Sequence, residues 1–176
     1  MNIELKKIDI NDSKTIDSYL KWENDQNLTH LIIPIRSKDQ EKHKTTKESI
    51  LEFFKNHPDR QEMTYIIYDN ETAIGNVNYY IDPPHLHKKI NNTAWIGLTI
   101  GEKDYWGTGA AFEAMTLLEE IFASKKIKRM ELGVFEFNTR AIKFYEKLGF
   151  KKIGEIKNFT YWDDRFWNDI RMEKNL

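Results

Sequence analysis

An asparagine and a tyrosine seven residues apart are the residues of this chain whose types and spacing best suit chemistry. Asn138 stands at an expected junction between a strand and a helix, and Tyr145 lies two turns further along that helix, on the same face. A tyrosine hydroxyl held beside a substrate can protonate a leaving group. Each residue also has an ordinary interpretation, a helix cap for Asn138 and a packed core side chain for Tyr145. The pair is informative because of the motif that precedes it.

A glycine-rich turn lies upstream of this pair, between a strand-like run and a helix-like run. It consists of Trp106, Gly107, Thr108, Gly109, Ala110 and Ala111. A helix N-terminus offers unpaired N–H groups and partial positive charge, and it binds diphosphate where small residues let the backbone come close. The Gly-Lys-Ser/Thr of a nucleotide-hydrolysing loop and the glycine spacing of a dinucleotide fingerprint are both missing. We therefore expect a diphosphate held by main-chain donors with little basic side-chain signal; a glycine-rich helix start without a ligand is the alternative.

Hydrophobic periodicity and turn residues predict the elements that must position these residues. Strands are expected over residues 1–9, 63–68, 73–81, 92–100, 130–135, 150–160 and 161–172. Helices are expected over residues 12–25, 38–56, 107–125 and 139–148, with a looser segment over 28–37 that Pro34 interrupts. The order β-α-α-β-β-β-α-β-α-β-β predicts an α/β (α+β) fold in one domain, residues 1–176. Its mixed sheet would have about six to seven strands and helices on both faces.

Composition narrows the classes of function. With 176 residues and a formal net charge of −1, the chain shows no bulk-charge signal for a nucleic-acid partner. No apolar run approaches the roughly 20 residues that a membrane helix needs. The absence of cysteine removes disulfides, thiolate metal sites and an acyl-cysteine intermediate. The first residues have no signal-peptide core, so a cytoplasmic setting is expected.

The two motifs together carry a family resemblance. Residues 94–150 resemble the GCN5-related N-acetyltransferase (GNAT) superfamily, whose acetyl-CoA signature Gln/Arg-x-x-Gly-x-Gly/Ala is matched by residues 106–111 with Trp106 at the first position. The second signature, Asn-x-x-Ala-x-x-x-Tyr-x-x-x-Gly-Phe, is matched by Asn138, Ala141, Tyr145, Gly149 and Phe150. The variant Tyr-Trp-Gly-x-Gly and the end of the chain are similar to the branch of ribosomal-protein alanine acetyltransferases.

The resemblance implies that an acetyl group passes from acetyl-CoA to a primary amine by direct attack in a ternary complex. It implies that Tyr145 protonates the leaving thiolate and that a backbone N–H of the strand ending at residues 98–100 polarises the carbonyl. The expected cofactor-binding residues are Leu98, Thr99, Ile100, Trp106, Gly107, Thr108, Gly109, Ala110, Ala111, Asn138, Ala141 and Phe144. No metal is expected.

The general base is left open, because the strand glutamate of related enzymes corresponds to Trp95 here. Glu23 or Asp25 could act through water, although solvated helix charges are the preferred interpretation of both. The pair His85 and His87 is interpreted as part of a surface loop rather than as metal ligands.

Residues expected near the acceptor are mostly aromatic, with core packing as the alternative interpretation for each. They are Trp22, Glu23, Tyr80, Trp95 and Trp162, joined more loosely by Tyr79 and Tyr161. The acceptor amine, on a small molecule or a protein N-terminus, is left open. The aromatics of the closing strands allow a homodimer without requiring one. A catalytically silent acyl-CoA-binding regulatory or interaction module is the competing hypothesis.

Overall fold

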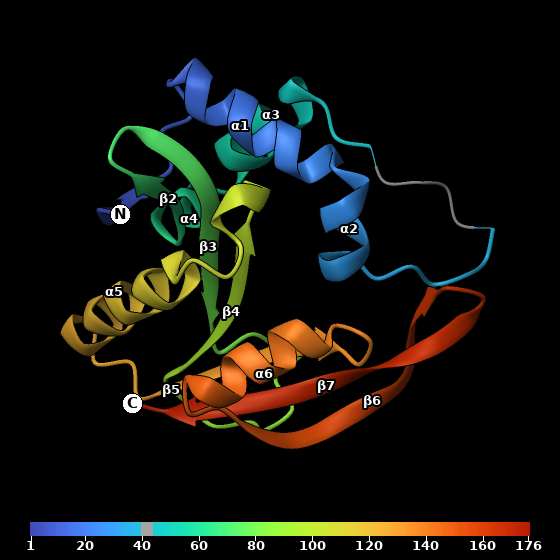
Figure 1. Cartoon of the computed structure of the whole chain (residues 1–176). Helices are drawn as coiled ribbons and strands as arrows, with labels where there is room; N and C mark the ends of the chain where they lie inside the picture. Colours follow the sequence, from blue (N-terminus) through green and yellow to red (C-terminus); the bar gives the residue numbers. More distant parts are fainter. Residues whose placement is uncertain (40–43) are drawn as a thin grey trace.

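A seven-stranded mixed sheet organises the chain (Figure 1). The computed structural model describes residues 1–39 and 44–176. The strands are β1 (Ile3–Lys7), β2 (Thr64–Asp69), β3 (Thr72–Ile81), β4 (Thr93–Ile100), β5 (Arg129–Phe135), β6 (Lys151–Trp162) and β7 (Arg165–Asn175). Their order in the sheet is β1-β2-β3-β4-β5-β7-β6, and every neighbouring pair is antiparallel except β4 and β5.

Helices cover both faces of this sheet. They are α1 (Ser13–Asn24), α2 (Gln26–Ile32), α3 (Lys47–Asn56), α4 (Pro58–Glu62), α5 (Ala110–Ser124) and α6 (Thr139–Lys147), with a 3-10 turn over Lys103–Tyr105. One core cluster joins α5 and α6 to β3, β4, β5 and β7. A second cluster packs α1, α2 and α3 against Ile66 of β2. The expected mixed α/β fold with helices on both faces is confirmed.

The sheet opens at its parallel pair. Residues 93–95 of β4 pair with residues 129–131 of β5, and the pairing stops there. Strand β4 continues to Ile100 with β3 as its partner, whereas β5 continues to Phe135 with β7. The two strands therefore diverge beyond Trp95 and Glu131, and Figure 1 shows β5, β6 and β7 running across the base of the view below β3 and β4.

Helix α2 covers residues 28–32 of the loose segment predicted over residues 28–37, so the prediction was wrong there, whereas residues 33–37 are irregular as predicted. The Asp25 side chain caps the helix by accepting a hydrogen bond from the main-chain N–H of Asn27 at 2.8 Å. Leu28 is buried against α1 and α3. Pro34 lies just beyond the helix, where proline is tolerated, so it does not interrupt it. Seven residues are too few to show helical periodicity in a sequence, so tertiary burial decides this helix.

The second predicted helix is shorter than expected. It was placed over residues 38–56, of which 40–43 lie outside the described residues, and α3 begins at Lys47. Thr46 and Ser49 form a capping box there, each side chain bonding the other residue's main chain. Pro58 follows α3 and opens the short helix α4 as its first residue, and the sequence analysis missed this helix.

Two turns are set by residues with positive φ. Gly107 and Gly109 have φ of 78° and 101°, so the helix predicted from residue 107 begins at Ala110 instead. Asp163 and Asp164, with φ of 51° and 59°, form the two-residue turn between β6 and β7. The longer paired strands of this hairpin extend to Trp162 and Asn175.

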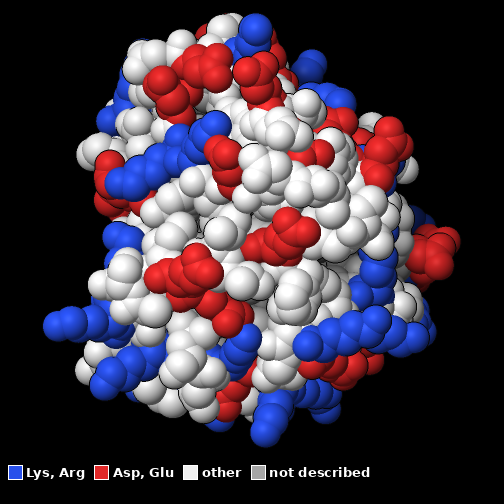
Figure 2. All heavy atoms as spheres, turned by 60° about the vertical axis from the view of Figure 1, so that its left-hand side comes forward, with Lys and Arg blue, Asp and Glu red and all other residues white. Residues whose placement is uncertain are grey.

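Both signs of charge occur on the face of the molecule that Figure 2 draws. Figure 2, which brings forward the side where α5 lies in Figure 1, shows Lys and Arg interspersed with Asp and Glu. Among the described residues, no helix is both long and apolar enough to cross a membrane.

Candidate active site

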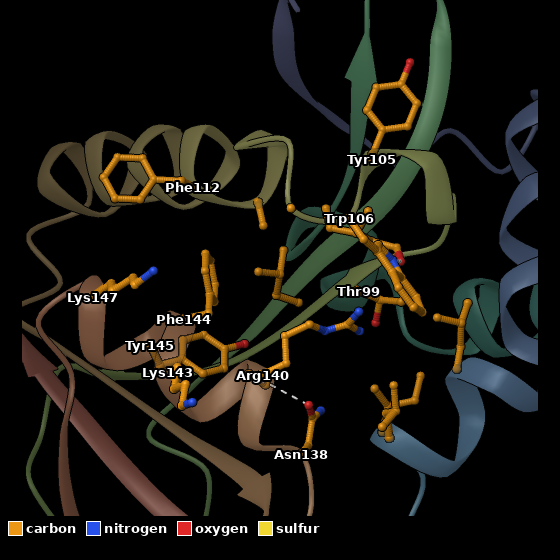
Figure 3. Close-up of a pocket in the computed structure, with 18 of the residues that line it drawn as sticks. Thr99, Tyr105, Trp106, Phe112, Asn138, Arg140, Lys143, Phe144, Tyr145 and Lys147 are labelled. Carbon is orange, nitrogen blue, oxygen red and sulfur yellow. Dashed lines mark hydrogen bonds between the residues drawn. The ribbon is translucent and has the colours of Figure 1, made fainter.

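A cavity of about 550 Å³ lies where β4 ends and the sheet opens (Figure 3). Its walls come from the end of β4, the glycine turn before α5, the start and one face of α6, and α2. Leu98 and Thr99 both line it, although consecutive strand residues point to opposite faces of a sheet. The cavity therefore passes through the opening between β4 and β5, from the α6 face to the face that α2 covers.

The glycine turn presents free main-chain donors to this cavity. Among the described residues, no group accepts a hydrogen bond from the N–H of Gly107, Gly109 or Ala111. These three residues line the cavity, and a side chain built on Gly107 would meet nothing within 4 Å. Since a 15-residue helix starts directly after Gly109, its dipole adds partial positive charge at the same place. The turn has the donors and the room that a diphosphate needs.

The other residues of the turn hold its shape. Trp106 lines the cavity, and its indole N–H donates to the carbonyl oxygen of Ile100 at 2.8 Å. The hydroxyl of Thr108 donates to the carbonyl oxygen of Tyr105 at 2.8 Å. Ala110 is fully buried beneath the turn. Thr108 and Ala110, both expected at the cofactor, contribute to the turn without lining the cavity.

Tyr145 forms part of the cavity wall on α6. Its side chain is 7% exposed and packs between the rings of Phe144 and Phe150, at 5.1 and 5.4 Å between ring centroids. Figure 3 shows its hydroxyl pointing into the cavity, and within the described part of the chain that hydroxyl has no hydrogen-bond partner. Burial raises the pKa of Tyr145 above its ordinary value, so the phenol keeps its proton at neutral pH.

Asn138 fixes the start of α6. Its side-chain oxygen accepts a hydrogen bond from the main-chain N–H of Ala141 at 3.2 Å, which is a normal N-cap arrangement. Asn138, Ala141, Phe144 and Tyr145 all line the cavity. The cap therefore orients the helix that carries the phenol.

Several lining residues were missed by the sequence analysis. Three cations of α6, namely Arg140, Lys143 and Lys147, line the cavity, so the expectation of a site with little basic side-chain contribution was wrong. Their spacing of three and four residues, on the helix that carries Asn138 and Tyr145, was the signal available. Further apolar lining comes from Leu28, Leu31, Ile32, Tyr105 and Phe112. The α2 residues among them could not be placed because the helix itself was missed.

The expected acceptor residues on α1 lie outside the cavity lining. Trp22 is 2% exposed, and its indole N–H donates to Glu102 at 2.8 Å. It packs in the core beneath α1, as its alternative interpretation had it. Glu23 is half-buried on the same helix. Asp25 caps α2 and pairs with Lys103 at 3.2 Å, and the hydrogen bond from the Asn27 main chain lowers its pKa.

The expected acceptor aromatics on the strands lie on the α2 face, outside the cavity lining. Tyr80 and Trp95 are cross-strand partners on β3 and β4. The guanidinium of Arg60 lies over the Tyr80 ring at 3.0 Å, and that of Arg171 over the Trp95 ring at 4.6 Å. Trp162, at the tip of the β6–β7 hairpin, stacks on His30 of α2 at 4.3 Å. Of the two looser candidates, Tyr79 packs in the core against Phe122 and Tyr161 bonds Asp164 in the hairpin.

The two loop histidines have structural contacts. The His85 ring meets the edge of Trp95 at 4.6 Å between centroids, and the His87 ring lies against Gly154. Within the described ranges, no group of three or more His, Asp or Glu side chains is arranged to hold a metal ion.

Comparisons with known proteins agree with this geometry. The model of the acetyltransferase (GNAT) family matches residues 19–150. A spermine/spermidine N(1)-acetyltransferase of Bacillus subtilis (strain 168) is 26% identical over 91 residues, which are 51% of this chain and 60% of that protein. The chain spans about 60% of the length of the curated relatives it matches.

Solved structures show the same fold over nearly the whole chain. Spermidine N-acetyltransferase from Vibrio cholerae, in complex with CoA and spermine, superposes with a TM-score of 0.78 at 17% identity, covering 99% of this chain and 95% of that one. An N-acetyltransferase from Staphylococcus aureus Mu50 gives 0.76 at 17% identity, covering 99% of both chains. Since the family model covers well over half of the residues, this chain belongs to the acetyltransferase (GNAT) family.

Proposed function

We propose that this protein transfers the acetyl group of acetyl-CoA to a primary amine by direct attack in a ternary complex. The observation that carries the proposal is one cavity with free main-chain donors at one side and a buried phenol at the other. The diphosphate of the coenzyme is assigned to the N–H groups of Gly107, Gly109 and Ala111. Arg140, Lys143 and Lys147 add positive charge along α6 that suits the phosphates.

The reaction needs a neutral amine, a polarised carbonyl and a proton for the leaving sulfur. The amine nitrogen attacks the thioester carbon, the C–N bond forms, and the C–S bond then breaks. A main-chain N–H among residues 98–100 stabilises charge on the carbonyl oxygen, since β4 has lost β5 as a partner there. Tyr145 gives its proton to the departing thiolate and recovers one from solvent. Burial raises the pKa of the Tyr145 phenol. The same desolvation disfavours the free thiolate and so raises the pKa of the CoA thiol as well, so the two pKa values rise together.

The class of acceptor is a finer proposal. Polyamines are supported by the names of a bacterial relative and of a solved neighbour. The Tyr-Trp-Gly-x-Gly motif supports the branch of ribosomal-protein alanine acetyltransferases, whose acceptor is a protein N-terminus. The aromatic side chains on the α2 face suit either acceptor. A cytoplasmic setting, a single domain and a homodimer stay predictions.

Thiol release during steady-state turnover tests the proposal. Acetyl-CoA is offered with spermine, spermidine, an amino sugar and a peptide with an N-terminal alanine. We expect at least one amine to release CoA thiol in proportion to N-acetylated product. Stabilisation by CoA without thiol release for any of these amines would instead favour the catalytically silent binding module.

A further inference from the structure

A buried carboxylate lies beside the sheet opening, on the face that α2 covers. Asp169 of β7 pairs with Phe135 at the end of β5, and Asp169 is 3% exposed. Its two carboxylate oxygens lie over Gly133, where a Cβ atom would approach them to 2.6 and 2.7 Å. The missing side chain at residue 133 therefore leaves the space that the carboxylate occupies.

Strand alternation places this group across the sheet from the phenol. Val134 and Ile170, the next residues along β5 and β7, belong to the core cluster that contains Tyr145. Asp169 and Gly133 consequently point to the opposite face. Strand β5 borders the opening between β4 and β5, and Asn138, just beyond its end, lines the cavity. Asp169 therefore lies beside this opening on the face opposite Tyr145, outside the cavity lining itself.

The carboxylate of Asp169 has one charged group in direct contact, and among the described residues none donates a hydrogen bond to its Oδ1 atom. Its ion-pair partner is Arg171 of the same strand, with 2.8 Å between Nε and Oδ2. Arg36, from the segment after α2, acts on it electrostatically. Burial outweighs both cations and raises the pKa of Asp169 to about 6. His85, whose carbonyl oxygen accepts a hydrogen bond from Arg171, and Glu131 are further titratable groups near Arg171.

The other carboxylate on this face of β5 is already engaged. Glu131 accepts hydrogen bonds from the main-chain N–H of His87 at 2.5 Å and of Lys88 at 3.3 Å. It also pairs with Arg129 at 2.5 Å, and its side chain is fully buried. Since each oxygen is held by donors, Glu131 is poorly placed to accept a further proton.

We propose that Asp169 is the general base, taking the proton from the attacking amine nitrogen on the α2 face. As the C–N bond forms, the nitrogen becomes positively charged and loses its proton to the Asp169 carboxylate, directly or through one water. On the other face, the C–S bond breaks and Tyr145 protonates the thiolate. The products are the amide and CoA thiol, and Asp169 returns its proton to solvent. This inference rests on the proposed acetyl transfer and adds the partner that the sequence left open.

The pH dependence of Asp169→Asn tests the assignment. The readout is kcat/KM for thiol release with the amine that the native enzyme uses best. If a base titrates near pH 6 and the amine near 10, the plot of log(kcat/KM) against pH has a slope of about two below pH 6 and about one above it. The change of slope near pH 6 is the break expected for the base. We expect Asp169→Asn to lower kcat/KM roughly 100-fold, to remove this break and to leave CoA affinity unchanged.

Three further variants separate a base from a structural residue. Gly133→Ala, whose methyl group displaces the carboxylate, should lower the rate with CoA affinity retained, and it serves if Asp169→Asn fails to fold. Asp163→Asn, at the exposed turn between β6 and β7, and His85→Asn should both keep the rate and the break in the pH profile.

The outcomes are distinguishable. If Asp169→Asn or Gly133→Ala kept the native rate and break, or if His85→Asn removed the break, Asp169 would not be the base. The proposed acetyl transfer would still stand. If the native enzyme released no thiol with any amine, both would be overturned.

Discussion

At the scale of single residues, the proposed catalysis depends on a phenol that is shielded from water. Tyr145 is buried among Phe144, Phe150 and the core beneath α6, yet its hydroxyl faces the cavity. A thiol of CoA titrates near 8.5, so a thiolate leaving into an apolar cavity needs a proton from nearby. Because burial raises the pKa of the phenol above its ordinary value, its role as an acid should not itself create a pH limit near neutrality.

We expect Tyr145→Phe to lower kcat at least about 100-fold, because the acid is lost while the ring still packs. CoA affinity should stay the same, since the diphosphate contacts are untouched. The matched control is Tyr65→Phe, a buried phenol of the same core cluster outside the cavity lining. Equal rates for Tyr145→Phe and the native enzyme across pH would rule out the acid role.

Sequence patterns located the residues that act through the main chain or through a helix start. Gly107, Gly109 and Asn138 are recognisable because their backbone roles demand particular residue types. Asp169 lies in a closing strand whose resemblance to the alanine-acetyltransferase branch assigned it no role, and its position depends on Gly133, 36 residues earlier in the chain. Such pairings are created by sheet register, which a single sequence does not reveal.

At the scale of elements, the site lies where one strand ends and two helices begin. β4 ends at the opening, α5 starts at the glycine turn, and α6 starts at Asn138. An N-cap therefore does two things here: it stabilises a helix and it positions the phenol two turns away. The cap of α1, Asp12, stabilises a helix without lining the cavity, so it offers a matched comparison.

We expect Asn138→Ala and Asp12→Ala each to lower the free energy of unfolding by about 1 kcal/mol, because each removes one N-cap. Urea denaturation measures that loss. Only Asn138→Ala should also weaken CoA binding and lower kcat, since it loosens the start of α6 at the cavity. Identical CoA affinity and turnover for the two variants would show that the cap has no part in the site.

The α6 cations give a second test at this scale. Replacing Lys143 and Lys147 together with Gln should weaken CoA binding several-fold at low salt and flatten the salt dependence, because phosphate attraction is screened by ions. Titrations at two salt concentrations measure this effect. A double variant with the native salt dependence would show that these lysines do not contact the coenzyme. Replacing Lys151 and Lys152 of β6, outside the cavity lining, is the control.

Long, periodic elements were predictable and short ones were not. The seven strands, α1, α5 and α6 follow the hydrophobic pattern closely. Helices α2 and α4 have seven and five residues, so their existence depends on caps and tertiary packing. The missed α2 mattered most, because it forms the cavity wall opposite α6.

At the scale of the whole molecule, binding should stabilise the fold. The cavity joins α2, β4, α5 and α6, so a ligand that fills it ties both faces of the sheet together. A ligand at 100 times its Kd adds about 2.7 kcal/mol to the free energy of unfolding. For a domain of this size that corresponds to roughly 5–10 °C in Tm. Differential scanning fluorimetry with CoA measures the shift, and an unchanged Tm at saturating CoA would contradict the assigned site.

Titration calorimetry of CoA into the native protein, Gly109→Val and Gly149→Val tests the central claim most directly. Both glycines have positive φ, 101° and 90°, so valine strains the backbone at each position. Of these two glycines, only Gly109 lines the cavity. We predict that the native protein and Gly149→Val bind CoA with equal affinity and that Gly109→Val binds at least about tenfold more weakly. Absence of binding heat from the native protein, or native affinity in Gly109→Val, would contradict a diphosphate site at this turn.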